Sequence, residues 1–203
     1  MGEHEEKIEI MRKYLADMTA AGNYHVKGNI PIKKIDNALQ TFAQGMDRTT
    51  MLGFLDTTVF GSGKNGYIFT DDKMYYVETM EKPKKLWYDD IKQLRILKSS
   101  KKDCNRELAI DFLDGSTFYI EGSFINKTPL KNFLNEMKNF EANKKAEKKK
   151  IENEKKNNFG AESAGRGIGA FRTVNNQFEE EKFHSRQGHG FAAERANNLF
   201  DKL

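Results

Sequence analysis

Apolar residues in the first fifty positions recur at the spacing of an α-helix. The stripe from Ile8 to Met18 advances in steps of three and four residues, which predicts a short amphipathic helix that ends before AAGN at residues 20–23. A second stripe follows the sequence NIP and predicts a helix with one buried face. Its apolar positions are Ile35, Ala38, Leu39, Phe42, Ala43 and Met46.

From residue 51 the spacing changes from helical to alternating. The sequences MLGFLDTTVF at 51–60 and GYIFTDDKMYYVE at 66–78 are rich in aromatic and β-branched residues, which favour strands. Between two such runs, TDDK at 70–73 is typical of a hairpin turn.

Further strand signals follow Pro83. The run at 84–100 carries YDD near its middle, which predicts a bulge or a short turn there. Two alternating runs at 107–122 surround Asp114-Gly115, a strong hairpin signal. We therefore expect about five to seven antiparallel strands in all.

A last helix is expected after the strands. Thr128 is a candidate N-cap and Pro129 suits the first helical turn. The apolar face of this helix is formed by Leu130, Phe133, Leu134 and Met137. We expect the helix to close one end of the strand region.

Beyond residue 140 the composition changes. Residues 141–158 are mainly lysine and glutamate, so they either extend the helix into solvent, as in a coiled coil, or are disordered. A glycine-rich linker follows at 159–171. The last thirty residues are too few to bury a core of their own, so their apolar stripe needs a partner surface. That stripe is formed by Ala192, Ala196, Leu199, Phe200 and Leu203.

Composition limits the functional classes. The formal net charge is +4 despite 64 charged side chains, which gives no whole-chain argument for nucleic-acid binding. The single cysteine, Cys104, fits a reducing compartment and excludes a disulfide framework within the chain. The N-terminus does not resemble a signal peptide, and no apolar run is long enough to span a bilayer. We expect a cytoplasmic protein.

The sequence FGSGKNG, from Phe60 to Gly66, raises the question of a nucleotide site. A Walker loop requires G-x-x-x-x-G-K-[ST], but here Asn65 follows Lys64 and Thr58 stands where the first glycine belongs. A helix should follow such a loop, whereas strand patterns follow here. We therefore interpret the glycines as a tight turn between strands and expect no cofactor.

This region resembles bacterial pleckstrin-homology-like domains. The resemblance covers residues 30–142 and depends on three features: Asp56 to Gly66, the Thr70-Asp71 turn, and the run from Tyr88 to Ile91. It implies an α+β fold, mainly an antiparallel barrel or bent sandwich, preceded by N-terminal helices and closed at one end by a helix. It also implies a binding or adaptor module that is not an enzyme.

The resemblance directs attention to two residues. Lys64 lies in the turn that corresponds to the lipid-binding loop of eukaryotic relatives, but such a site usually needs several basic residues, so membrane lipid is the lesser alternative. Trp87 is a candidate anchor for a protein partner and also a candidate core residue.

The C-terminal sequence KFHSRQGHGFAAERANNLFDKL at 182–203, with QGHGFAAERANNL at its centre, resembles a box in larger bacterial proteins of mobile-element or toxin-like type. We expect no metal site there, because His184, His189 and Glu194 are five residues apart and not at the i, i+4 spacing of a zinc pair on a helix. These three residues and Arg195 remain candidates for an interaction, including contact with nucleic acid.

The sequence therefore predicts four segments. Residues 1–29 form an N-terminal helical extension, 30–142 the pleckstrin-homology-like domain, 143–170 a charged and glycine-rich linker, and 171–203 a helical C-terminal motif. The leading functional prediction is a non-enzymatic adaptor that binds another protein. The alternative is a short form or fragment of a nuclease-associated or toxin-like effector that contacts nucleic acid through the C-terminal box.

Overall fold

The computed structural model describes residues 2–19, 23–78, 81–97, 100–121 and 124–163, with side chains up to residue 154. The chain divides into two compact units, Met1–Asn153 and Glu154–Leu203. All packing and contacts below belong to the first unit.

Helix α1 (Glu3–Met18) forms where the first apolar stripe predicts it, and the face from Ile8 to Met18 is buried. Helix α2 (Ile32–Thr41) is shorter than its stripe predicts. The N–H groups of Phe42 and Ala43 both donate to the Ala38 carbonyl, so the regular ladder ends there. Phe42 and Ala43 are nevertheless buried, because the chain beyond the helix stays against the sheet.

Five strands form one antiparallel sheet in the order β1-β2-β3-β4-β5. The three-residue strand β1 is not visible in the sequence pattern, because it is too short to show an alternation. The 3-10 turn η1 (Arg48–Thr50) leads into β2. The five strands are β1 (Tyr24–Val26), β2 (Met51–Asp56), β3 (Gly66–Thr70), β4 (Lys73–Val77) and β5 (Lys84–Trp87).

Three further strands form a second antiparallel sheet in the order β6-β7-β8. The 3-10 turn η2 (Tyr88–Asp90) separates β5 from β6, at the YDD where the sequence predicts a bulge or turn. The predicted hairpin at Asp114-Gly115 is also present, with Gly115 at φ +87°. The strands are β6 (Ile91–Ile96), β7 (Leu108–Phe112) and β8 (Thr117–Ile120), and the turn η3 (Asp103–Asn105) precedes β7.

Helix α3 (Lys127–Ser163) begins two residues before Pro129, where the sequence predicts its first turn. Thr128 is not its N-cap: the Thr128 N–H and hydroxyl donate to the Asp103 carboxylate at 2.7 and 2.6 Å. The cap is therefore supplied by η3, which no local pattern could reveal. Of the two alternatives for the lysine-rich run, the structure has the helical one, because α3 continues through it.

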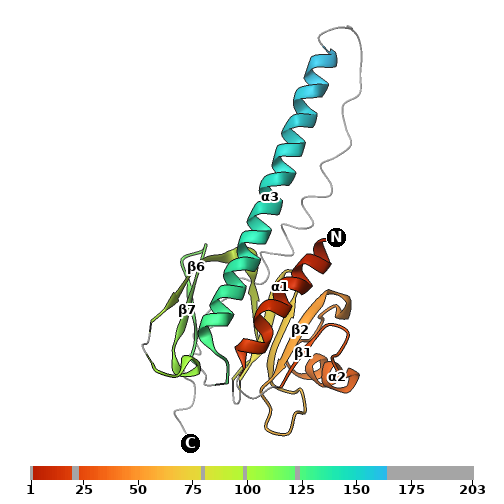
Figure 1. The fold of residues 1–203 in the computed structure, drawn as a ribbon. Coiled ribbons are helices and arrows are strands. Elements are labelled where there is room, and N and C mark those ends of the chain that lie inside the picture. The colour runs from red at the N-terminus through yellow and green to blue at the C-terminus, as the bar shows by residue number, and fades with distance from the viewer. Residues whose placement is uncertain (1, 20–22, 79–80, 98–99, 122–123, 164–203) are drawn as a thin grey trace, which may run out of the picture. The chain divides into compact units, whose positions relative to one another are not determined.

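The larger core lies between the two sheets, α1 and the first turns of α3. Figure 1 shows α1 and α3 side by side over the strands, with α2 at another face of the five-stranded sheet. A smaller core joins α2 to that face. The architecture is thus α+β with antiparallel sheets, as expected, although the described strands form two separate sheets and no closed barrel.

Candidate binding surfaces

The glycine-rich turn after β2 is organised by one buried carboxylate. Oδ1 of Asp56 accepts hydrogen bonds from the N–H of Thr58 at 3.0 Å and from its hydroxyl at 2.5 Å. Oδ2 accepts the Gly63 N–H at 3.1 Å and lies 2.9 Å from Nζ of Lys34 on α2. The Asp56 carboxylate therefore connects both ends of the turn to α2.

The glycines serve the path of the chain. Gly61 and Gly63 have φ of +64° and +73°, which disfavours residues with a side chain. The N–H of Ser62 donates to the Thr58 hydroxyl at 2.7 Å, and the Gly63 N–H is held by Asp56. A phosphate-binding loop must turn such amides toward its ligand, but here they are already hydrogen-bonded within the turn. The geometry agrees with a structural turn.

Two apolar side chains stand at the tip of this turn. The Gly61 N–H donates to the Thr58 carbonyl at 3.1 Å, so Val59 and Phe60 occupy the central positions of a β-turn. Their exposed fractions are 86% and 96%. We call these two residues the apolar turn tip. It was missed at the sequence level, although adjacent apolar residues next to a glycine-rich turn were a visible signal.

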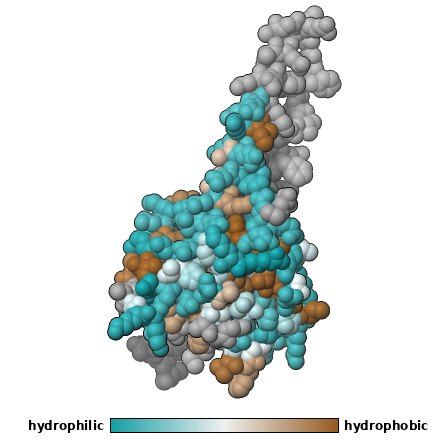
Figure 2. All heavy atoms as spheres, in the orientation of Figure 1, coloured by the Kyte–Doolittle hydropathy of each residue, from teal (hydrophilic) through white to brown (hydrophobic). Residues whose placement is uncertain are grey.

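The apolar turn tip has a rigid support. The side-chain amide of Asn37 donates to the Ser62 carbonyl at 2.7 Å, and the Thr41 hydroxyl donates to the Lys64 carbonyl at 3.2 Å. Isolated exposed hydrophobic residues are normal, and Figure 2 shows small, separate hydrophobic areas on a largely hydrophilic face. Two adjacent ones on a hydrogen-bonded support form a preorganised contact point.

A second surface combines lysines with aromatic rings on β4 and β5. Lys73 lies directly opposite Trp87, and Tyr75 lies opposite Lys85, so the four side chains share one face of the sheet. Nζ of Lys73 lies 3.8 Å from the centre of the Trp87 ring, and Nζ of Lys85 lies 5.5 Å from that of Tyr75. We call these residues the lysine–aromatic quartet. Burial raises the pKa of Tyr75 to about 12, with a smaller contribution from Asp72.

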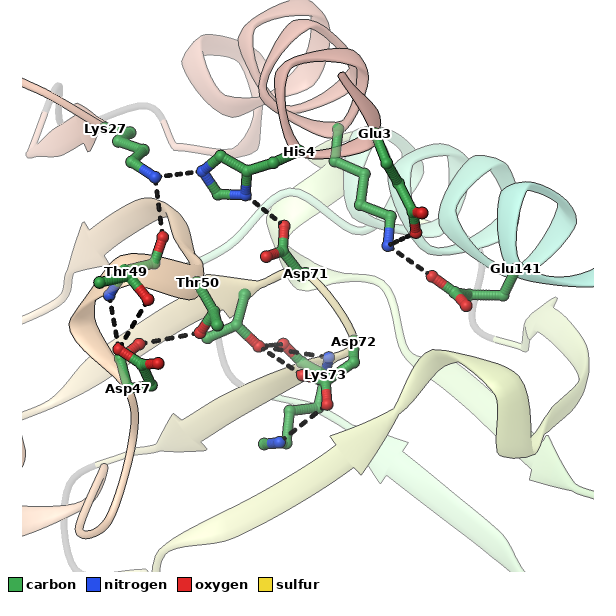
Figure 3. A network of polar contacts seen from close by, with 12 residues as sticks. Glu3, His4, Lys27, Asp47, Thr49, Thr50, Asp71, Asp72, Lys73 and Glu141 are labelled. Atoms are coloured by element: carbon green, nitrogen blue, oxygen red, sulfur yellow. Dashed lines mark hydrogen bonds and ion pairs between the residues drawn. The ribbon is translucent and has the colours of Figure 1, made fainter. Parts of the chain in front are cut away.

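A polar network joins the start of α1 to two turns of the five-stranded sheet (Figure 3). Nδ1 of His4 lies 2.6 Å from the Asp71 carboxylate, and its Nε2 contacts the ammonium group of Lys27. Lys27 also donates to the Thr49 carbonyl at 2.7 Å. An aspartate–histidine pair can activate a nucleophile, but Nε2 faces an ammonium here and not a hydroxyl or thiol. The arrangement holds α1 against the sheet.

A buried lysine on α1, Lys7, contacts α3 in the same region. Nζ of Lys7 donates to Glu3 at 3.0 Å and to Glu141 at 2.7 Å (Figure 3). Burial opposes the charge of Lys7, but its hydrogen bonds to Glu141 and Glu3 outweigh that effect and raise its pKa above the ordinary value. A buried cation that is held by two carboxylates is a link between helices.

Another buried lysine, Lys127, is the first residue of α3. Nζ of Lys127 donates to the carbonyls of Cys104 and Ile125 at 3.1 and 2.8 Å. Burial lowers the pKa of Lys127 below its ordinary value. These bonds tie η3 to the start of α3. The bond to Cys104 involves its backbone carbonyl, and its free side chain is half-buried.

Of the six residues that the sequence suggests for an interaction, the structure describes two. Trp87 is half-buried within the lysine–aromatic quartet, and Lys64 is exposed in the turn next to the apolar turn tip. His184, His189, Glu194 and Arg195 lie outside the described residues, so their roles stay predictions. The whole C-terminal box lies outside the described residues as well.

Comparisons with protein-family models, with curated proteins and with solved structures found no match for this chain. Within the described ranges, no group of three or more histidine, cysteine or acidic residues could hold a metal ion. None of the helices in the same ranges is both long and apolar enough to cross a bilayer.

Proposed function

We propose that this chain is a non-enzymatic module of pleckstrin-homology-like type that binds another protein through the apolar turn tip. The arrangement of strands supports this proposal. Seven antiparallel strands between Met51 and Ile120 form two sheets, and α3 follows them with its first turns in the core. That order of elements is the one that the family resemblance implies.

The exposure of Phe60, at 96%, carries the proposal. Burying a phenylalanine side chain in a partner pocket is worth about 1.5–3 kcal/mol. The hydrogen bonds from Asp56 and α2 hold the turn, so little conformational entropy is lost when a partner covers it. Such aromatic anchors dominate the affinity of many protein interfaces.

A protein pocket suits the apolar turn tip better than a lipid surface. Lipid recognition through charge takes a cluster of about 4–8 basic residues. The turn itself contributes Lys64, while the nearby Lys34 is paired with Asp56 at 2.9 Å. The charge at the tip is therefore small, and its apolar contact area must supply the affinity.

Photo-crosslinking from Phe60 tests the proposal directly. A photoreactive phenylalanine analogue would replace Phe60 in the full chain, which is then irradiated in the cells that produce it. The matched control carries the same analogue at Leu113, which is 67% exposed next to the other glycine turn. A protein that crosslinks from position 60 and not from 113 is then purified, and its affinity for the unmodified chain is measured.

Phe60→Ser should weaken that affinity by about 10- to 100-fold, as expected for a lost phenylalanine contact. Leu113→Ser should leave it within about twofold. Equal crosslinking from both positions, or an affinity that Phe60→Ser leaves unchanged, would overturn the proposal. Sedimentation of the chain with anionic vesicles that depends on Phe60 would replace the protein partner by a membrane.

A further inference from the structure

We propose that the lysine–aromatic quartet and the outer edge of β5 bind an extended acidic peptide segment of a protein. This goes beyond the proposed function, because it concerns a different surface and a stated class of partner. The turn that carries the apolar turn tip leads into Gly66, which pairs with Val77 at one end of β4. The quartet includes Lys73 and Trp87 at the opposite end of β4.

The edge of β5 offers backbone hydrogen bonds. In the order of the five-stranded sheet β5 is the last strand, and it pairs with β4 alone among the described strands. Alternate residues of an edge strand direct their N–H and C=O groups away from the sheet, where an extended peptide can add as a further strand. Extended conformation is therefore the first property of the ligand.

The charges along this edge favour carboxylates. Nζ of Lys73 lies 3.0 Å from the Asp72 carboxylate, and Nζ of Lys84 lies 2.7 Å from that of Glu81. Lys82 and Lys85 are exposed, and neither forms an ion pair with another described residue. On the face of the quartet, Lys73 and Lys85 thus outnumber the one carboxylate that pairs with them, that of Asp72, whereas Lys84 lies on the opposite face, with its Nζ 4.7 Å from the centre of the Phe118 ring. Acidic residues are therefore the second property of the ligand.

The aromatic rings distinguish a peptide from a nucleic acid. Single-stranded nucleic acids stack their bases on open aromatic faces. Here Nζ of Lys73 already lies 3.8 Å from the centre of the Trp87 ring, and Tyr75 is 2% exposed. A lysine ammonium group has three donors, so each can bind a carboxylate while its charge lies near a ring. The quartet therefore suits carboxylates next to apolar side chains better than it suits bases.

The chain carries its own reporter for this surface. Trp87 is the single tryptophan of the sequence, so tryptophan emission, excited at a wavelength that tyrosine does not absorb, reports on the quartet. The full chain would be titrated with an eight-residue peptide of alternating glutamate and valine. Its controls are the lysine–valine peptide of the same length and a glutamate–valine peptide that is N-methylated at alternate residues. A fluorescently labelled peptide gives the affinity independently by anisotropy.

Two variants with the same charge change make the matched pair. Lys85→Glu changes the quartet, and Lys64→Glu changes an exposed lysine in the turn after β2. We expect the glutamate–valine peptide to change Trp87 emission with saturation and to lose at least about tenfold in affinity in Lys85→Glu. Lys64→Glu should stay within about twofold. Far-UV circular dichroism and the Tm verify that both variants fold.

Several results would overturn this inference. They are a peptide affinity equal in both variants, equal binding of the lysine–valine or N-methylated peptide, and no binding of the glutamate–valine peptide at millimolar concentration. A thymidine 15-mer that displaces the peptide, and whose own binding is also weakened by Lys85→Glu, would assign the surface to nucleic acid. Self-association of Lys85→Ala without any peptide binding would show that the lysines only protect the strand edge. None of these results bears on Phe60 crosslinking, so the two proposals fail separately.

Discussion

The Lys34 ammonium on α2 lies 2.9 Å from Oδ2 of Asp56, whose side chain has no exposed surface. The same carboxylate accepts hydrogen bonds from Thr58 and Gly63. One residue at the end of β2 therefore connects the sheet, α2 and the turn that presents Phe60. The shape of the apolar turn tip depends on this buried charge and on the residues that satisfy it.

Removal of the buried carboxylate should destabilise the chain strongly. Asp56→Ala removes the acceptor of the Thr58 N–H and the closer acceptor of the Gly63 N–H, and it leaves Lys34 without its carboxylate. We therefore expect it to lower the free energy of unfolding by about 3–5 kcal/mol, as when a buried ion pair is broken. Urea unfolding followed by circular dichroism measures this loss. Asp36→Ala is the control, because the Asp36 side chain is 41% exposed beside Arg48. That variant should lose less than about 1 kcal/mol, and equal losses would contradict the role of Asp56.

Two glycines in left-handed conformation should differ in their tolerance of alanine. Gly63→Ala and Gly115→Ala both incur the cost of a positive φ, about 1–2 kcal/mol. A Cβ at Gly63 would lie 2.9 Å from the backbone of Lys34, whereas a Cβ at Gly115 meets nothing within 4 Å. We therefore expect Gly63→Ala to cost about 1–3 kcal/mol more in urea unfolding. Equal costs would mean that the turn does not pack tightly on α2.

The apolar turn tip should contribute nothing to folding. The double substitution Val59→Ser/Phe60→Ser changes side chains that are 86% and 96% exposed, so we expect the free energy of unfolding to stay within about 0.5 kcal/mol. Phe54→Ala, at a position with no exposed surface, is the contrasting variant and should cost about 3–5 kcal/mol. A large loss of unfolding free energy in the double variant would show that Val59 and Phe60 pack within the fold and are not available to a partner.

The pKa of Asp111 should depend on its partner across the second sheet. The Arg95 guanidinium donates two hydrogen bonds to the Asp111 carboxylate, each 2.8 Å long, and Thr117 donates another. These bonds lower the pKa of Asp111 to about 2. Because the folded pKa is below the unfolded value of about 3.9, the resulting stabilisation is complete above that value and is lost as the pH falls toward 2.

Titration of the Asp111 carboxyl by NMR tests this arrangement. In Arg95→Gln the pKa of Asp111 should rise toward its ordinary value. The substitution removes the positive charge of Arg95, whose hydrogen bonds are the largest cause of the lowered pKa. The control is Arg48→Gln, which removes an equal charge from the exposed pair with Asp36. An Asp111 pKa that does not respond to Arg95→Gln would show that the contact is not formed in solution.

The local sequence determined most of the elements of the fold. The helical stripe of α1, the alternation in β3 and β4, and the Asp114-Gly115 hairpin are all present where their patterns predict them. Each of these signals is carried by neighbouring residues and by their preference for one backbone conformation, so it can be read without the fold. The interpretation of the glycine-rich stretch as a turn also rests on local evidence, and the structure agrees with it.

Tertiary structure decided what the local sequence could not show. The strand β1 exists through its pairing with β2, and the cap of α3 comes from Asp103, 25 positions before Thr128. The exposure of Phe60 follows from Asp56 and α2 holding the turn away from both cores. The lysine–aromatic quartet requires the register of β4 and β5, which places Lys73 opposite Trp87. These features depend on contacts between distant segments, and single-sequence periodicity contains no information about which distant segments meet.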